Sequence, residues 1–306
     1  MPFRDIYRAQ VELMIRTLSY VAEEQCFALK GGTAINLFVR DMPRLSVDID
    51  LTYLPLKDRN AALDDIESAL MRIADRIKRA DPAMVVTSSA PGTQSQINKL
   101  VARTRERVQI KIEVTPVLRG CVYAPVMMGV SEKTEDRFGF AEINTLSFAD
   151  LYAGKIMAAL DRQHPRDLFD IHLLLNTEGI TDELPTALVV YLIAHGRPPQ
   201  TLLAPTLKDI APEFKHNFQG MTENDIDLAV LIEARAALIE DIRVNMPEQH
   251  KQFLYSFYRR EPDWDLIGVD GASRLPAVRW REQNLDNAGA DTREEIVARL
   301  EQIFVR

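Results

Sequence analysis

The sequence predicts an α/β protein in which a mixed sheet with flanking helices is followed by a helical domain. Short runs in which apolar and polar residues alternate, a pattern typical of strands, lie before about residue 145. Beyond that point apolar residues recur almost wholly at helical spacing. The 306 residues suffice for two ordinary domains with sizeable cores. We therefore expect domains at residues 1–145 and 146–306.

The first domain is expected to alternate between helices and strands. Helical spacing of apolar residues predicts helices at Asp5–Glu24, Thr33–Phe38 and Asn60–Arg79. Period-two patterns and turn residues predict strands at Phe27–Leu29, Ser46–Tyr53, Met84–Thr87, Lys99–Arg103 and Gln109–Val114. A turn at Pro91–Gly92 is expected between the third and fourth of these strands.

The second domain is expected to be almost wholly helical. The predicted helices are Ser147–Leu160, Asp167–Asn176, Leu184–Ala194, Glu223–Arg243, Pro247–Tyr258 and Arg293–Phe304. The segment Pro262–Asn284, which contains Pro, Gly and Trp residues, is expected to fold back over another surface.

Composition limits the classes of protein to consider. A net charge of −8 makes a general nucleic-acid binder a poor fit, so any RNA contact needs a local basic surface. Cys26 and Cys121 are too few for a disulfide framework, and we expect them to be reduced in a cytoplasmic protein. The sequence shows no signal-peptide pattern and no apolar run that could span a bilayer, so no membrane association is expected.

The most informative segment runs from Lys30 to Leu51 and carries Asp48 and Asp50 on one predicted strand. Alternate strand residues point to the same face, so these two carboxylates share one face while apolar neighbours occupy the other. Adjacent carboxylates repel each other unless a cation lies between them. Oxygen ligands of this kind suit Mg²⁺, which binds carboxylates together with substrate phosphates. Asp48 and Asp50 are therefore candidate magnesium ligands.

A Gly31–Gly32 turn precedes the helix that begins near Thr33. Free N–H groups at a helix N-terminus attract phosphate. Metal and triphosphate can thus meet in one cleft, and this combination suggests transfer of a nucleoside monophosphate (NMP) from a nucleoside triphosphate (NTP) to an acceptor hydroxyl.

Glu113 is a third candidate ligand for metal. It alternates with buried-type residues in Gln109–Val114 and so faces away from the core. If its strand neighbours the strand of Asp48 and Asp50, three carboxylates converge and can hold two metal ions. The alternative is an ordinary solvated strand residue.

A second constellation lies between Ala153 and Leu175. Lys155 and Arg162 are seven residues apart, so they lie on roughly one helical face and can neutralise triphosphate charge. Asp167 lies near the start of the next helix and shares a face with Asp170. The alternative is a surface ion-pair network among these groups.

Two basic clusters are candidate paths for an RNA strand. The first comprises Arg72, Arg76 and Arg79 on one helix, with Lys78 alongside. The second comprises Arg103, Arg105, Arg107 and Lys111 around a predicted hairpin. Phosphate contacts of this kind supply affinity without reading sequence. The alternative is a solvated helix and a guard against edge-strand aggregation.

The motifs KGGTAI, RLSVDIDL, IEV and GKIMAALDRQHPRDLFD together resemble the AbiEii/AbiGii toxin family, part of the DNA polymerase β-like nucleotidyltransferase superfamily. The resemblance covers most of the chain and implies a nucleotidyltransferase fold. It also implies a toxin of a toxin–antitoxin or phage-defence system, with a cognate antitoxin as partner and RNA, such as the tRNA 3′ end, as acceptor.

The resemblance implies roles for particular residues. Those expected to act in catalysis are Asp48, Asp50, Lys155, Asp167 and Asp170. Those expected to bind nucleotide are Lys30, Gly31, Gly32, Thr33, Ser46 and Arg162. Asp48 and Asp50, with Glu113, are expected to bind Mg²⁺. Three alternatives stay open: a small-molecule nucleotidyltransferase, a phosphotransferase acting on protein, and a non-enzymatic NTP-binding regulator.

Overall fold

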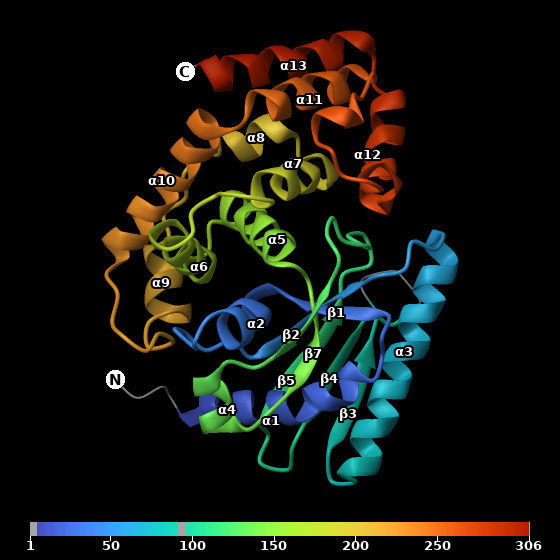
Figure 1. Cartoon of the computed structure of the whole chain (residues 1–306). Coiled ribbons are helices and arrows are strands. Elements are labelled where there is room, and N and C mark those ends of the chain that lie inside the picture. The colour runs from blue at the N-terminus through green and yellow to red at the C-terminus, as the bar shows by residue number, and fades with distance from the viewer. Residues whose placement is uncertain (1–4, 91–95, 306) are drawn as a thin grey trace. The chain divides into compact units, whose positions relative to one another are not determined.

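The computed structural model describes residues 5–90 and 96–305 (Figure 1). The chain divides into two compact units. The first unit comprises residues 1–147 and 220–225, and the second comprises residues 148–219 and 226–306. A stretch of a few residues therefore leaves the second unit and returns to the first. The expected turn at Pro91–Gly92 lies outside the described residues.

The first unit is built on a seven-stranded mixed sheet with the order β3-β4-β5-β2-β1-β7-β6. The pairs β2–β5 and β1–β7 are parallel, and the other neighbours are antiparallel. The strands are β1 (Phe27–Lys30), β2 (Asp48–Tyr53), β3 (Val85–Ser89), β4 (Lys99–Arg103), β5 (Gln109–Val114), β6 (Val126–Gly129) and β7 (Glu142–Thr145). The predicted α/β class with a mixed sheet is confirmed.

Helices cover one face of this sheet (Figure 1). The helices of the first unit are α1 (Asp5–Ala22), α2 (Gly31–Ala34) with a following π-helical turn (Ile35–Val39), α3 (Arg59–Ala80) and α4 (Glu132–Phe138). One side of α3 is fully apolar and buried, and Ile49, Leu51 and Ile112 from the sheet are also fully buried. Burial of this apolar area supplies most of the driving force for the unit, and it fixes which strand residues face outward.

The second unit is helical. Its helices are α5 (Phe148–Asp161), α6 (Pro165–Asn176), α7 (Leu184–Ala194), α8 (Pro199–Leu203), α9 (Ala211–Asn217), α10 (Leu228–Asn245), α11 (Glu248–Arg259), α12 (Pro276–Asp286) and α13 (Ala290–Val305), with short 3₁₀ turns at Trp264–Leu266 and Ala272–Arg274. The Trp264 ring packs 5.0 Å from Phe253 and 6.2 Å from Phe257, so the tail lies against α11. None of the helices in the described ranges is long and apolar enough to cross a membrane.

One predicted helix begins later than expected. The helix predicted over Glu223–Arg243 begins at Leu228, because the residues before it pair with the first unit instead. Met221 accepts a hydrogen bond from the Leu45 N–H at 2.9 Å, and Glu223 N–H donates to the Pro43 carbonyl at 3.0 Å. The β-bridge between Arg44 and Thr222 holds this segment against residues 43–45 in place of a helical turn.

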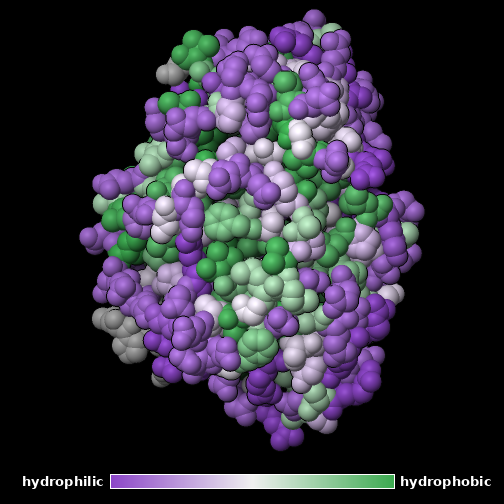
Figure 2. Space-filling view, viewed as in Figure 1, coloured by the Kyte–Doolittle hydropathy of each residue, from purple (hydrophilic) through white to green (hydrophobic). Residues whose placement is uncertain are grey.

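The surface is mainly hydrophilic. Figure 2 shows hydrophilic residues over much of the visible face, with smaller groups of hydrophobic residues between them. The exposed large apolar side chains are scattered along the chain, from Leu56 and Val85 to Trp280 and Val305. Scattered apolar side chains are ordinary on a folded protein and do not by themselves mark a site.

Candidate active site

Strand β2 holds Asp48 and Asp50 on the sheet face opposite the helices. Ile49 and Leu51, which alternate with them, are fully buried in the core. Both aspartates are partly exposed. The two carboxylates therefore lie on one accessible face of a central strand, as the alternation predicts.

The turn before α2 meets the second of these aspartates. Gly31 has a φ of +74°, and a Cβ atom added there would lie 2.9 Å from Asp50 Oδ2. Only glycine adopts this backbone conformation readily, and only glycine leaves room for the carboxylate. The Gly31–Gly32 turn and the Asp50 side chain, nineteen residues apart in sequence, are thus in direct contact.

A buried arginine completes the turn on its other side. Arg44 is 2% exposed, and its Nη2 atom would lie 2.7 Å from a Cβ on Gly32. Ser46 Oγ lies 3.0 Å from the same position and accepts a hydrogen bond from Thr33 Oγ1 at 3.0 Å. Sequence reasoning missed Arg44. The one available signal was its position two residues before Ser46, in the segment that leads into the carboxylate strand.

Lysines flank the carboxylates across the sheet. Lys30 on β1 is the register partner of Asp50 on β2. Asp50 is in turn the partner of Glu113 on β5, and Glu113 is the partner of Lys99 on β4. The result is a row of side chains, Lys30–Asp50–Glu113–Lys99, over four adjacent strands. Desolvation lowers the pKa of Lys30, although the charges of Asp50 and Glu113 act in the opposite direction. Lys30 Nζ donates to Thr115 Oγ1 at 2.7 Å.

Glu113 is placed beside Asp50, as expected, but its carboxylate also has a protein partner. Its Oε2 lies 3.7 Å from Lys99 Nζ, and its side chain is 47% exposed. Within the described ranges, no three His, Cys, Asp or Glu side chains are arranged to hold a metal ion. Glu113 as a metal ligand therefore stays a prediction.

Lys155, Arg162, Asp167 and Asp170 come together in the second unit. Lys155 Nζ lies 2.9 Å from Asp167 Oδ1 and 2.9 Å from Asp170 Oδ2. Arg162 Nη2 donates to Asp167 Oδ1 at 2.8 Å. The two aspartates are fully buried and the Lys155 side chain is 5% exposed, whereas the Arg162 side chain is 62% exposed.

This cluster is a buried, charge-balanced ion-pair network rather than the surface network considered above. Burial alone would raise the pKa of Asp167, but the charges of Lys155 and Arg162 outweigh it, and the pKa is well below its usual range. Paired charges of this kind tolerate burial only when each finds its partners. The four residues are thus held in one geometry, with Arg162 as the member that reaches solvent.

The first predicted basic cluster serves packing. Arg72 and Arg76 both pair with Glu24 at 2.7 Å, and the Glu24 side chain is 7% exposed. Arg76 also reaches Glu23 at 2.8 Å. These pairs tie α3 to the end of α1, so Arg72 and Arg76 are not free to form an RNA path.

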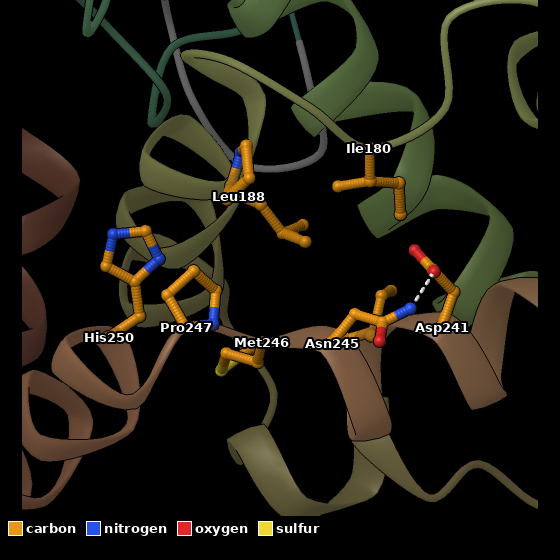
Figure 3. Close-up of a pocket in the computed structure, with 9 residues that line it drawn as sticks. Ile180, Leu188, Asp241, Asn245, Met246, Pro247 and His250 are labelled. Carbon is orange, nitrogen blue, oxygen red and sulfur yellow. Dashed lines mark hydrogen bonds between the residues drawn. The ribbon is translucent and has the colours of Figure 1, made fainter.

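A small hollow in the second unit lies among Ile180, Leu188, Met246 and His250 (Figure 3). Its free volume of about 20 Å³ is close to that of one water molecule. Burial lowers the pKa of His250 and keeps this ring neutral near pH 7. The hollow is far too small for a nucleotide. The carboxylate face of β2 is the candidate active site because Asp48, Asp50 and the Gly31 turn meet there.

Comparisons with known proteins identify the fold and the family of this chain. A search of curated proteins finds no match. Among solved structures, the chain is similar to MenT4, a nucleotidyltransferase toxin from Mycobacterium tuberculosis H37Rv, with a TM-score of 0.54 and 15% identity over 98% of this chain and 95% of that one. At this identity the likeness concerns the fold. Residues 12–281 match the family described as nucleotidyl transferase AbiEii toxin, type IV toxin–antitoxin system. The chain therefore belongs to the AbiEii family of nucleotidyltransferase toxins.

Proposed function

We propose that this toxin transfers an NMP from an NTP to a hydroxyl of RNA, with the tRNA 3′ end as the acceptor. The observation that carries the proposal is the carboxylate pair Asp48 and Asp50 on one strand face, with Asp50 lying against the Gly31 turn. A phosphate seat and a pair of anionic oxygen donors in contact are what nucleotidyl transfer requires.

The residues at this face fit a magnesium ion. The donors are carboxylate oxygens with no sulfur or imidazole among them, which is the set that Mg²⁺ prefers. Asp48 and Asp50 would hold the ion, with Glu113 as the third carboxylate. When bound, the ion neutralises triphosphate charge and lowers the pKa of a coordinated hydroxyl.

The turn residues would bind the β- and γ-phosphates. Gly31 and Gly32 let the backbone approach closely, and Thr33 with Ser46 fixes the turn through their mutual hydrogen bond. Lys30 and Arg44 add positive charge on either side of the turn. Fixed positive charge aimed at developing negative charge is worth most in a partly desolvated site.

For Lys155 and Arg162 we propose contact with nucleotide phosphate, as the family resemblance implies. Lys155 and Arg162 supply the cations, and Asp167 with Asp170 holds Lys155 in place. In the reaction, the acceptor hydroxyl oxygen bonds to the α-phosphorus, and the bond to the β-phosphate oxygen breaks. Pyrophosphate leaves, and the hydroxyl proton passes to water.

The family membership supports a cognate antitoxin as the biological partner, and we place the pair in phage defence. RNA is favoured over a small-molecule acceptor because the exposed basic side chains of Arg103 and Lys111 lie on the same sheet face as Asp48. A small-molecule acceptor would need no such surface.

The position of a labelled phosphate in the NTP tests the proposal. Purified protein is incubated with Mg²⁺ and total RNA, with each NTP labelled at the α- or the γ-phosphate, and the RNA is resolved on a denaturing gel. We expect the tRNA band to become labelled when the NTP carries the α label and to stay unlabelled when it carries the γ label. Product that carries only the γ label would show phosphotransfer, and activity without RNA would favour the small-molecule alternative.

A further inference from the structure

The outward face of strands β4 and β5 carries basic side chains next to the candidate active site. Residues 99–111 contain five Lys or Arg and one Glu, whereas the whole chain has 37 Lys and Arg against 45 Asp and Glu. This local excess stands out in an acidic protein, and it continues around the hairpin through Arg105 and Arg107.

Strand register places these charges on the carboxylate face. Asp48 on β2 is the register partner of Lys111 on β5. Lys111 is also the register partner of Val101 on β4. Arg103 is the partner of Gln109, so it lies diagonally from Lys111, about 7–8 Å away. Leu100, Ala102 and the other alternating residues are buried in the core, which confirms that Arg103 and Lys111 point outward.

Arg103 and Lys111 have no protein partner among residues 5–90 and 96–305. Lys99 pairs with Glu113, but the structure records no hydrogen bond or ion pair from Arg103 or Lys111 to another described residue. Both side chains are exposed. Both side chains are therefore available to a bound anion.

Protection of a sheet edge does not account for them. The strand order makes β3 the edge, while β4 and β5 are interior strands. The outward residues of β3 are uncharged Val85, Thr87 and Ser89. Charges that prevent edge-to-edge pairing belong on the edge strand itself.

We infer that this face, comprising Arg103 and Lys111 with the hairpin arginines beyond them, binds the phosphate backbone of the RNA acceptor and leads it to Asp48. The inference rests on the proposed function. From Lys99 to Arg103, β4 spans roughly 13 Å, which is longer than a triphosphate needs and suits successive phosphates of a strand. The face has no aromatic residue on β3, β4 or β5, so contacts go to the backbone and not to stacked bases.

The test compares two double variants that remove the same charge. Arg103→Ala/Lys111→Ala alters the proposed surface. Arg8→Ala/Arg16→Ala is the matched control, because both residues are exposed on α1, a helix that covers the opposite face of the sheet. Melting curves of both variants verify folding, and Arg103→Lys/Lys111→Arg preserves charge.

Binding of a 12-nucleotide fluorescent single-stranded RNA is measured by anisotropy over a range of salt. We expect the slope of log affinity against log salt to fall by about 1.4 in the Arg103/Lys111 variant, at roughly 0.7 per phosphate contact. The control and the charge-preserving variant keep the wild-type slope. In NMP transfer, the KM for tRNA rises at least tenfold in the Arg103/Lys111 variant alone.

The outcomes separate the two proposals. If wild type labels tRNA but Arg103→Ala/Lys111→Ala keeps the wild-type slope and KM, the surface is wrong and the proposed function stands. An equal loss in the Arg8/Arg16 control would show that net charge alone causes the effect, and it would also overturn the proposed surface. If wild type labels no RNA, the proposed function fails and the inference fails with it.

Discussion

Gly31 sets how closely the Asp50 carboxylate approaches the phosphate seat. Two separate observations require glycine at this position: the φ of +74°, and the 2.9 Å separation between an added Cβ atom and Asp50 Oδ2. The first concerns backbone conformation and the second concerns space. Substitutions can separate the two requirements, because other glycines in the chain have a positive φ but open space around an added Cβ atom.

Gly31→Ala is predicted to lower activity more than stability. The positive φ costs roughly 1–2 kcal/mol for a residue with a Cβ, and the methyl group must also displace Asp50. Gly268→Ala is the control, since Gly268 has a φ of +58° and nothing within 4 Å of an added Cβ. Urea unfolding should show similar losses in both variants, whereas NMP transfer should fall only in Gly31→Ala. Equal activity in the two would contradict the contact with Asp50.

At the scale of elements, α5 and α6 are joined by the network of Lys155, Arg162, Asp167 and Asp170. Lys155 on α5 bonds both aspartates on α6. The network therefore serves the packing of these helices whatever else it does. The question is whether Lys155 also acts on nucleotide.

A single variant and a charge-balanced double variant test whether Lys155 acts on nucleotide. Lys155→Met leaves two buried carboxylates short of a cation and should cost about 3–5 kcal/mol of unfolding free energy. Lys155→Met/Asp170→Asn removes one charge of each sign and should recover part of that stability. If Lys155 contacts phosphate, NMP transfer stays low in both variants. Activity that returns together with stability would make Lys155 a purely structural residue.

The same network predicts a pH dependence. The folded pKa of Asp167 lies below its ordinary value of 3.8. Its ionisation therefore stabilises the fold above pH 3.8, and this contribution is lost as the pH falls through the folded pKa. Between pH 4 and 2, the unfolding free energy of wild type should fall more steeply than that of Asp167→Asn, by up to about 1.4 kcal/mol per pH unit. Parallel profiles would contradict the assignment.

Elements with long local patterns could be predicted from sequence, and elements defined by distant contacts could not. Strands β2 and β5 alternate cleanly, so the outward positions of Asp48, Asp50 and Glu113 followed from the residues. Strands β6 and β7 have four residues each, too few to show a period. Arg44 and the pairing of residues 221–223 with residues 43–45 depend on contacts between segments far apart in the chain, which no local pattern reveals.

At the scale of the whole molecule, we expect the effect of this toxin to depend on turnover. The chain belongs to a toxin family, and the proposed function assigns the toxicity to chemistry at the β2 carboxylates. A non-enzymatic NTP-binding regulator would act without that chemistry. Cell growth distinguishes the two.

Induced expression of wild type without an antitoxin is predicted to arrest growth, whereas Asp48→Asn is predicted to leave growth normal at equal protein level. The substitution keeps the size of the side chain and removes the charge that would hold Mg²⁺. Colony counts after induction, with immunoblots for protein level, are the measurement. Arrest by Asp48→Asn would favour the regulator.

The most direct test is the initial rate of α-phosphate label transfer to RNA by Asp48→Asn and Asp50→Asn. Asp75→Asn, an exposed aspartate on α3, is the control. Loss of an outer partner of a metal ligand typically costs about 10–100-fold, so loss of a direct ligand should cost at least about 100-fold. We predict that loss in both β2 variants, with wild-type melting curves and full activity in Asp75→Asn. Near-normal rates in either β2 variant would show that these carboxylates do not hold the metal.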